Sequence, residues 1–191
     1  MRPSISSSAG TFAWIVHARF GIICAGVSLL LSASALAGDP LVRPGLKVGD
    51  PSPVFSDFAL VPNTLPPTNG KVVLLDFWAS WCAPCKASFP AYSRIDQEFR
   101  DAGLVVIAVG VDDKLAAHNA FVEKLKPTFQ IVHDSTKSLV KAVNVKSMPT
   151  AYLIGRDGKV RSIHVGFFGR KTEVDLRNEI QSLLKEQPPV P

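Results

Sequence analysis

The sequence predicts an α/β fold with a central mixed sheet and helices on both faces. Apolar runs typical of buried strands alternate with apolar stripes at helical spacing, and a short polar turn separates the last two runs. Strand–helix–strand order makes parallel neighbours, whereas a tight turn makes antiparallel ones. We therefore expect parallel strands first and an antiparallel pair last. The length of 191 residues fits one domain.

The start of the domain is expected to be extended. Residues 38–70 are rich in Pro and Gly, which remove backbone donors and block long helices. We place an extended arm at 38–48, the folded domain at 49–187 and a tail at 188–191. A short edge hairpin is expected from four apolar residues, Val54, Phe55, Phe58 and Leu60.

Five apolar runs predict the strands. They cover residues 71–78, 104–111, 129–132, 150–154 and 159–165. The first run is apolar on both faces and should be the central strand. Gly155–Gly158 forms the turn between the last two strands, which are expected to pair as a hairpin.

Four helices are expected. Apolar residues at spacings of 4, 3, 3 and 4 predict the first over residues 83–100, with a kink at Pro90. The other three are expected to begin at polar N-caps and to bury apolar stripes. Their N-cap candidates are Asp112 or Asp113, Ser135 or Thr136, and Thr172. Asn144 suits the left-handed end of the third helix.

Composition excludes two classes of protein. Hydrophobic residues are 47% and charged residues 19%, which excludes a disordered chain, and no apolar run repeats as in a multi-span membrane protein. The formal charge of +5 comes from basic residues that are scattered along the chain and never form a run of the sort that tracks phosphates. We therefore expect no nucleic-acid partner.

The first 37 residues have the pattern of a secretory signal peptide. They contain no Asp or Glu, carry two arginines, and end in a long apolar run of small residues. Ala35 and Ala37 fit a signal-peptidase site, so we expect cleavage after Ala37. An uncleaved membrane anchor is the alternative, because the run approaches the length of a membrane span. In both cases we expect an exported, periplasmic protein.

Cleavage would leave Cys82 and Cys85 as the cysteines of the exported chain, because Cys24 lies in the signal segment. Lipidation at Cys24 is rejected, since Ile23 before it is too bulky for a lipoprotein site. Two closely spaced cysteines in an exported protein are expected to pair with each other.

The two cysteines lie where the central strand gives way to the first helix. A thiol at a helix N-terminus faces unpaired N–H groups and the positive end of the helix dipole, so its pKa falls from about 8.5 toward neutrality. Cys82 is therefore the candidate nucleophile. Cys85, one turn further, can attack the mixed disulfide that Cys82 forms. Pro84 fits the first helical turn, where a missing N–H costs no hydrogen bond.

Two other uses of this pair are disfavoured. Zinc needs four ligands, and the sequence has no second cysteine pair or close histidine pair. A purely structural disulfide would close a very small loop and would restrict the unfolded chain little. Redox exchange is the better interpretation.

The run Asp76-Phe-Trp-Ala-Ser-Trp-Cys-Ala-Pro-Cys85 resembles the active-site segment of the thioredoxin fold. Residues 45–187 are similar to the exported TlpA-like group, which includes ResA and the cytochrome c maturation reductase CcmG. Three further matches carry this resemblance: residues 49–55, Met148-Pro149-Thr150, and Gly155-Arg-Asp-Gly158 followed by His164-Val-Gly166. The resemblance implies a thioredoxin fold with an N-terminal extension and an inserted strand–helix unit.

The resemblance also assigns site residues. Pro149 is expected to be a cis proline facing the disulfide, with the Met148 backbone free to pair with an extended substrate. Asp76 matches the buried carboxylate of thioredoxins, in which desolvation raises the pKa and lets the group take the Cys85 proton. An Asp76 that only pairs with a cation or a backbone amide is the alternative.

Two tryptophans and two departures from the group complete this picture. Trp78 is expected in the core, and Trp81 on the substrate surface beside Pro84. The group often has Glu at the position of Ser88, and commonly Asn at that of Asp76. We hypothesise that proton handling has moved from the helix to the strand, which weakens the case for a dedicated cytochrome c role.

Other polar residues receive structural roles. His133 and Asp134 are expected to be a solvated loop pair, and Asp112 and Asp113 helix caps rather than metal ligands. A copper-ligand role for His164 is disfavoured, because exported copper-delivery proteins of this fold use a wider cysteine spacing.

The sequence thus predicts an exported thiol–disulfide oxidoreductase, acting as a reductant of protein disulfides with no cofactor beyond its own redox disulfide. Ala-Pro between the cysteines supplies no histidine to stabilise the Cys82 thiolate, so the pair should be less oxidising than strong oxidants. The family implies apocytochrome c as client and a DsbD/CcdA-type membrane thiol transporter as electron donor. A copper-binding or docking module with little turnover is the alternative. Peroxide reduction is disfavoured, because no Thr-x-x-Cys segment occurs.

Overall fold

The computed structural model describes residues 45–187. The predicted signal peptide at 1–37, most of the arm and the tail at 188–191 lie outside the described residues. Within residues 45–187, no helix combines the length and the apolar character needed to cross a membrane.

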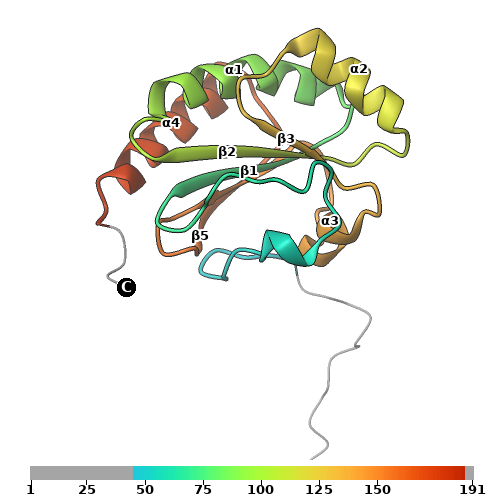
Figure 1. Cartoon of the computed structure of the whole chain (residues 1–191). Coiled ribbons are helices and arrows are strands. Elements are labelled where there is room, and N and C mark those ends of the chain that lie inside the picture. The colour runs from blue at the N-terminus through green and yellow to red at the C-terminus, as the bar shows by residue number, and fades with distance from the viewer. Residues whose placement is uncertain (1–44, 188–191) are drawn as a thin grey trace, which may run out of the picture. The chain divides into compact units, whose positions relative to one another are not determined.

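A five-stranded mixed sheet forms the centre of the domain, in the order β3-β2-β1-β4-β5 (Figure 1). The strands are β1 (Val72–Trp78), β2 (Leu104–Gly110), β3 (Gln130–His133), β4 (Thr150–Ile154) and β5 (Val160–Val165). β1, β2 and β3 run parallel, while β4 is antiparallel to both β1 and β5. The predicted order of parallel and antiparallel strands is confirmed. So is the central position of β1, which is buried along its whole length.

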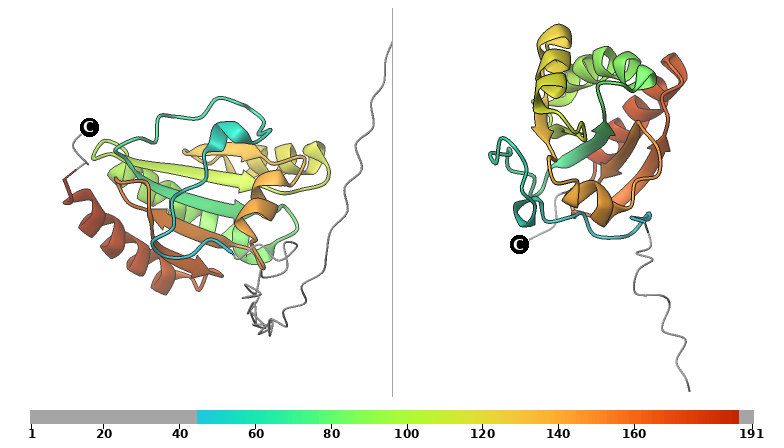
Figure 2. Two further views of the ribbon diagram at one scale, coloured as in Figure 1. Left: turned by 90° about the horizontal axis from the view of Figure 1, so that it is seen from below. Right: turned by 90° about the vertical axis from the view of Figure 1, so that its right-hand side faces the viewer.

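Helices cover the two faces of the sheet unequally. One face carries α1 (Ala83–Phe99), α2 (Leu115–Leu125) and α4 (Arg170–Leu184), as Figures 1 and 2 show. The other face carries the short α3 (Ser138–Val143) together with the N-terminal segment and its 3-10 helix η1 (Phe55–Asp57). Helices on both faces are therefore confirmed, and the N-terminal segment covers part of the face that has only α3.

The predicted N-terminal hairpin is wrong. Residues 54–58 form η1 and its flanks, and the described part of this segment reaches the strands through two isolated bridges, Pro51 to Lys159 and Val61 to His133. Prolines before and after η1 lack the N–H that a continuous ladder requires, so each pairing stops after one residue.

Two of the predicted N-caps, those of α2 and α3, are wrong. α2 follows Lys114 and α3 follows Lys137, and neither residue makes a side-chain cap hydrogen bond. Asp134 satisfies the start of α3, since its carboxylate accepts hydrogen bonds from the N–H groups of Ser138 at 3.0 Å and Val140 at 2.9 Å. A cap can therefore lie several residues before the helix when a turn brings it back.

The start of α4 differs from the prediction, whereas the end of α3 agrees with it. α4 begins after Gly169, so Thr172 lies inside the first turn, where its hydroxyl accepts a hydrogen bond from the N–H of Phe168 at 3.0 Å. Asn144 ends α3 with φ 58°, which confirms the predicted left-handed end. α1 is one helix that contains Pro90 in its interior, and the kink stays a prediction.

Candidate active site

Cys82 and Cys85 form a disulfide at the N-terminus of α1, which confirms the predicted pairing. Cys82 is the N-cap residue, and its Sγ accepts a hydrogen bond from the backbone N–H of Cys85 at 3.3 Å. A thiolate at this Sγ would be stabilised by the same N–H group and by the helix dipole.

Exposure differs sharply around the pair. Trp81 is 72% exposed, Cys82 is 4% exposed and Cys85 is fully buried. Pro84 is exposed in the first turn of α1. An incoming substrate can therefore meet Cys82 beside Trp81 and Pro84, while Cys85 lies beneath.

Asp76 lies in the middle of β1 and is fully buried. Its neighbours across the sheet are Ala108 of β2 and Ala151 of β4, and directly paired residues point to the same face. One carboxylate oxygen accepts a hydrogen bond from the Tyr92 hydroxyl at 3.3 Å, and the other has no hydrogen-bond partner among the described residues. Burial raises the pKa of Asp76 well above its ordinary value, and the Tyr92 hydrogen bond opposes this more weakly.

The alternative for Asp76, pairing with a cation or a backbone amide, is not what residues 45–187 show. Its hydrogen bond within that part of the chain comes from a neutral hydroxyl. A carboxylate with so little compensation is a stronger base than an exposed one, which is the property that the proton-acceptor hypothesis requires.

Tyr92 and Ser88 connect Asp76 to the backbone of Cys85. The Ser88 hydroxyl lies 3.0 Å from the carbonyl oxygen of Cys85 and also interacts with the Tyr92 hydroxyl. Both residues are buried, and the pKa of Tyr92 is raised by burial and by the adjacent Asp76. From the sequence, Tyr92 is expected only as part of the buried stripe of the helix that is α1. Tyr92 lies seven residues after Cys85 and therefore on the same helix face. This spacing could have indicated that Tyr92 lies near the active site.

Pro149 lies at the same edge of the sheet as the disulfide. β1 runs toward the disulfide at its carboxyl end, and antiparallel β4 begins at that end with Thr150. The Met148–Pro149 peptide bond is cis, as predicted. Pro149 is buried and Met148 half-buried. The carbonyl oxygen of Pro149 accepts a hydrogen bond from the N–H of Gly166 at 2.8 Å, which ties the start of β4 to the loop after β5.

Asp112 holds the segment that leads into Cys82, a role that sequence analysis missed. Its carboxylate accepts hydrogen bonds from the Ser80 N–H at 3.1 Å and from the Ser80 hydroxyl at 2.6 Å. The parallel register explains the contact: Trp78 pairs with Gly110, so Ser80 and Asp112 are level two residues further on. The helix-cap interpretation of Asp112 is therefore wrong, and Asp113 forms an ion pair with Lys137 instead of a cap.

The histidines also differ from expectation. His133 and Asp134 are buried, so the solvated-pair interpretation is wrong. The Nε2 atom of His133 lies 2.7 Å from the carbonyl oxygen of Asp112. His118 packs beside His133, with ring centroids 4.8 Å apart and the rings tilted by 45°. His164 lies on β5, 3.0 Å from a carboxylate oxygen of Glu179.

Comparison with known proteins agrees with this geometry. Residues 49–163 match the AhpC/TSA family. The chain is 34% identical over 114 residues to the thiol-disulfide oxidoreductase ResA of Bacillus subtilis. The aligned segment is 59% of this chain and 63% of that relative. It is 30% identical over 143 residues to the thiol-disulfide oxidoreductase ResA of Geobacillus thermodenitrificans. That aligned segment is 74% of this chain and 80% of that relative.

A solved structure shows the same fold. A Chlorobium tepidum protein described as a thiol:disulfide interchange protein DsbE is 34% identical, with a TM-score of 0.65 over 73% of this chain and 99% of that one. Together with the Cys82–Cys85 disulfide at the start of α1, these matches confirm the thioredoxin-type α/β fold. The chain therefore belongs to the AhpC/TSA family and is a thiol–disulfide oxidoreductase of the ResA and DsbE type.

Proposed function

We propose that the protein works outside the cytoplasm as a reductant of disulfides in client proteins. The observation that carries the proposal is the position of Cys82, the N-cap of α1, whose Sγ accepts the Cys85 N–H. Ala83 and Pro84 between the cysteines add no positive charge that would stabilise the Cys82 thiolate further. A thiolate of moderate stability favours a reductant over a strong oxidant.

The reaction begins at Cys82. Its thiolate attacks one sulfur of the client disulfide, a mixed disulfide forms, and the other client sulfur leaves as a thiolate. Asp76 then takes the proton of the Cys85 thiol, directly or through water. The Cys85 thiolate attacks Cys82 Sγ and releases the second client thiolate. The client gains two electrons and the enzyme returns to the Cys82–Cys85 disulfide.

Four residues are proposed to contact the client. Trp81 and Pro84 are exposed beside Cys82, and Met148 and Pro149 lie at the same edge of the sheet. An extended client segment beside Met148 would exchange backbone hydrogen bonds with it.

The partners are proposed on the family resemblance. Apocytochrome c is the leading client, and a membrane thiol transporter of the DsbD/CcdA type supplies the electrons, because the space outside the cytoplasm does not provide a reductant. The signal pattern of residues 1–37 supports export, with membrane attachment if that segment is retained.

Two measurements test the proposal. Cys85→Ser should trap a client on Cys82 as a mixed disulfide, whereas Cys82→Ser should trap none. The reduction potential of the pair should lie near that of thioredoxin, about −270 mV, rather than near that of DsbA, about −120 mV. A potential near the DsbA value would reverse the proposed direction of electron flow.

A further inference from the structure

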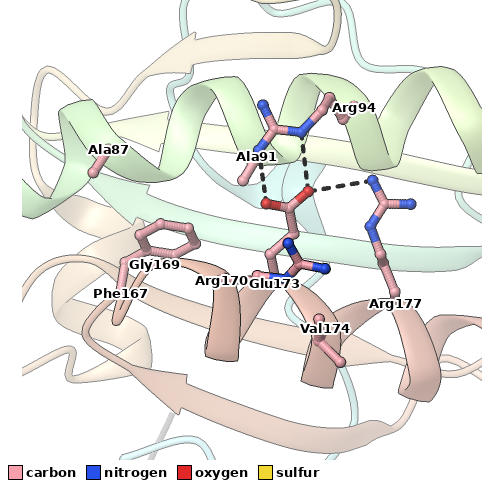
Figure 3. Close-up of a pocket in the computed structure, with 9 residues that line it drawn as sticks. All are labelled: Ala87, Ala91, Arg94, Phe167, Gly169, Arg170, Glu173, Val174 and Arg177. Atoms are coloured by element: carbon pink, nitrogen blue, oxygen red, sulfur yellow. Dashed lines mark hydrogen bonds and ion pairs between the residues drawn. The ribbon is translucent and has the colours of Figure 1, made fainter.

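A groove of about 620 Å³ runs between α1 and α4 (Figure 3). Its apolar lining comes from the methyl groups of Ala87 and Ala91, from Phe167 and from Val174. Its charged lining consists of three arginines and one carboxylate, Arg94, Arg170, Arg177 and Glu173. The groove thus combines an apolar wall with a cluster of guanidinium groups.

Positive charge exceeds negative charge in this groove. Glu173 accepts hydrogen bonds from Arg94 at 3.0 and 2.7 Å and from Arg177 at 3.3 Å, and Figure 3 shows these two arginines meeting its carboxylate. Arg177 also contacts Glu98. Arg170 is exposed and forms no ion pair with any residue between 45 and 187. One guanidinium is therefore free to bind an added carboxylate.

The groove lies on the active-site side of the domain. Phe167 follows Gly166, whose N–H is bonded to the carbonyl oxygen of Pro149. Phe168, in the same loop, is 73% exposed, and Trp81 beside the disulfide is 72% exposed. These are the two most exposed large apolar side chains of the described chain. Phe168 lies between Phe167 and Gly169, which line the groove, and an exposed aromatic side chain in such a place is typical of a surface that binds another polypeptide.

We propose that this groove holds the part of a client polypeptide that flanks its reacting cysteine, and that it selects clients with an acidic side chain near that cysteine. The inference rests on the proposed function and adds the substrate class. Its occupant is an extended segment whose apolar residues contact the groove wall and whose carboxylate pairs with Arg170.

Helix geometry sets the spacing between the client's cysteine and its acidic residue. α1 and α4 run side by side in the same direction, because Arg94 contacts Glu173 while Glu98 contacts Arg177 one turn later. Arg170, one turn before Glu173, is therefore level with about residue 91 of α1. At ~1.5 Å per helical residue, that level lies roughly 14 Å from Cys82 along the axis. An extended chain covers roughly 14 Å in about four residues, so the acidic residue should lie about four to six residues from the cysteine.

Model peptides test the inference directly. Each peptide carries one cysteine, blocked by 2-mercaptoethanol as a neutral mixed disulfide, with Asp or Asn five residues after it or five residues before it. The measured quantity is the rate at which the reduced enzyme releases 2-mercaptoethanol from the peptide. For each enzyme variant this rate is divided by the rate at which the same variant reduces bis(2-hydroxyethyl) disulfide, which gives a relative rate for each peptide. The Asp peptide of one series should react about 2- to 5-fold faster than its Asn partner at low salt.

Charge reversal identifies the groove. Arg170→Glu should remove the preference for Asp or invert it. Lys171→Glu is the matched control, because Lys171 is the next residue, makes the same change in net charge, pairs with Asp175 and does not line the groove. This control should keep the preference for Asp.

Each other outcome has a definite meaning. Equal rates for Asp and Asn peptides in both series, or equal losses in Arg170→Glu and Lys171→Glu, would overturn the groove while leaving the reductant proposal intact. Failure to reduce even bis(2-hydroxyethyl) disulfide would instead contradict the proposed function. Sedimentation of the wild type as a dimer that Arg170→Glu dissociates would assign the groove to a second copy of the chain and overturn the client inference.

Discussion

Asp76 combines burial with little hydrogen bonding, and this combination sets its chemistry. Its neighbours on the two adjacent strands are alanines. One carboxylate oxygen accepts a hydrogen bond from the Tyr92 hydroxyl, and the other has no hydrogen-bond partner among the described residues. Burial is the larger effect on its pKa and acts upward. Asp76 therefore holds a proton more strongly than an exposed carboxylate does.

Replacing the carboxylate should slow the second half of the reaction. Asp76→Asn keeps the shape but removes the proton acceptor, so release of a client peptide from Cys82 by Cys85 should slow by about 10²-fold or more. Single-turnover release across pH measures this step. In the wild type the rate should rise as Asp76 loses its proton, whereas the variant should follow only the ionisation of the Cys85 thiol. If Asp76→Asn leaves the release rate and its pH profile unchanged, the general-base role of Asp76 is contradicted.

Tyr92 should tune the same step without taking part in it. Its hydrogen bond lowers the pKa of Asp76. Tyr92→Phe therefore raises that pKa further, and the rise in release rate should move to higher pH. A variant that is merely less stable, by the roughly 1–3 kcal/mol expected for an unsatisfied buried acceptor, would leave the profile where it is.

At the scale of the elements, the turn between β1 and α1 is held by a residue of another strand. Asp112, two residues beyond β2, accepts the N–H and hydroxyl of Ser80, and its carbonyl oxygen contacts His133. The segment before Cys82 is thus fixed by the register of two parallel strands.

Asp112→Ala should loosen this turn. We expect the free energy of unfolding to fall by about 1–3 kcal/mol, because two half-buried donors of Ser80 lose their acceptor. The thiolate fraction of Cys82 should fall with it. Asp113→Ala is the matched control, since Asp113 is exposed and forms only a surface ion pair with Lys137. That change should stay within about 0.5 kcal/mol. Equal losses in both variants, by urea unfolding, would contradict the role of Asp112.

The strands could be predicted from the sequence to within about two residues, because each is an apolar run that can be recognised from the local sequence alone. The caps could not. Asp112 has the composition of an N-cap, but the register of β1 and β2 brings Ser80 to it first. The N-terminal hairpin failed for a related reason, since Phe55 and its neighbours are apolar enough for a strand but lie between prolines that stop pairing.

For the molecule as a whole, one buried histidine, His118, couples folding to pH. His118 is 4% exposed and packs against Trp78 and His133. Burial first, and then the charge of His133, lower the pKa of His118 to about 4, while Asp112 acts in the opposite direction. Between the unfolded pKa near 6.5 and this value, the unfolded chain holds a proton that the folded chain does not.

Stability should therefore be complete above about pH 7 and fall as the pH drops toward 4, by roughly 2–4 kcal/mol from His118. His118→Leu keeps an apolar side chain beside Trp78 and removes the titrating group. Urea unfolding from pH 4 to pH 8 should show that the difference between wild type and variant changes across this window. A difference that stays constant with pH would contradict the assignment to His118.

The redox pair itself could be predicted from the sequence, because two cysteines at the junction of a strand and a helix form a local pattern. The buried chain from Ser88 through Tyr92 to Asp76 could not, because it depends on how α1 packs on β1. The groove between α1 and α4 joins residues far apart in the sequence, such as Arg94 and Glu173, and no periodicity in either helix indicates it.

The central claim is that the helix N-terminus keeps Cys82 ionised near neutral pH. The most direct measurement is the rate of alkylation of the reduced protein by iodoacetamide as a function of pH, with mass spectrometry to assign the modified sulfur. We predict that Cys82 is alkylated first, with an apparent thiolate pKa below the value of about 8.5 for free cysteine, while the buried Cys85 is protected. Alkylation of both sulfurs no faster than that of a free thiol in solution would contradict the account.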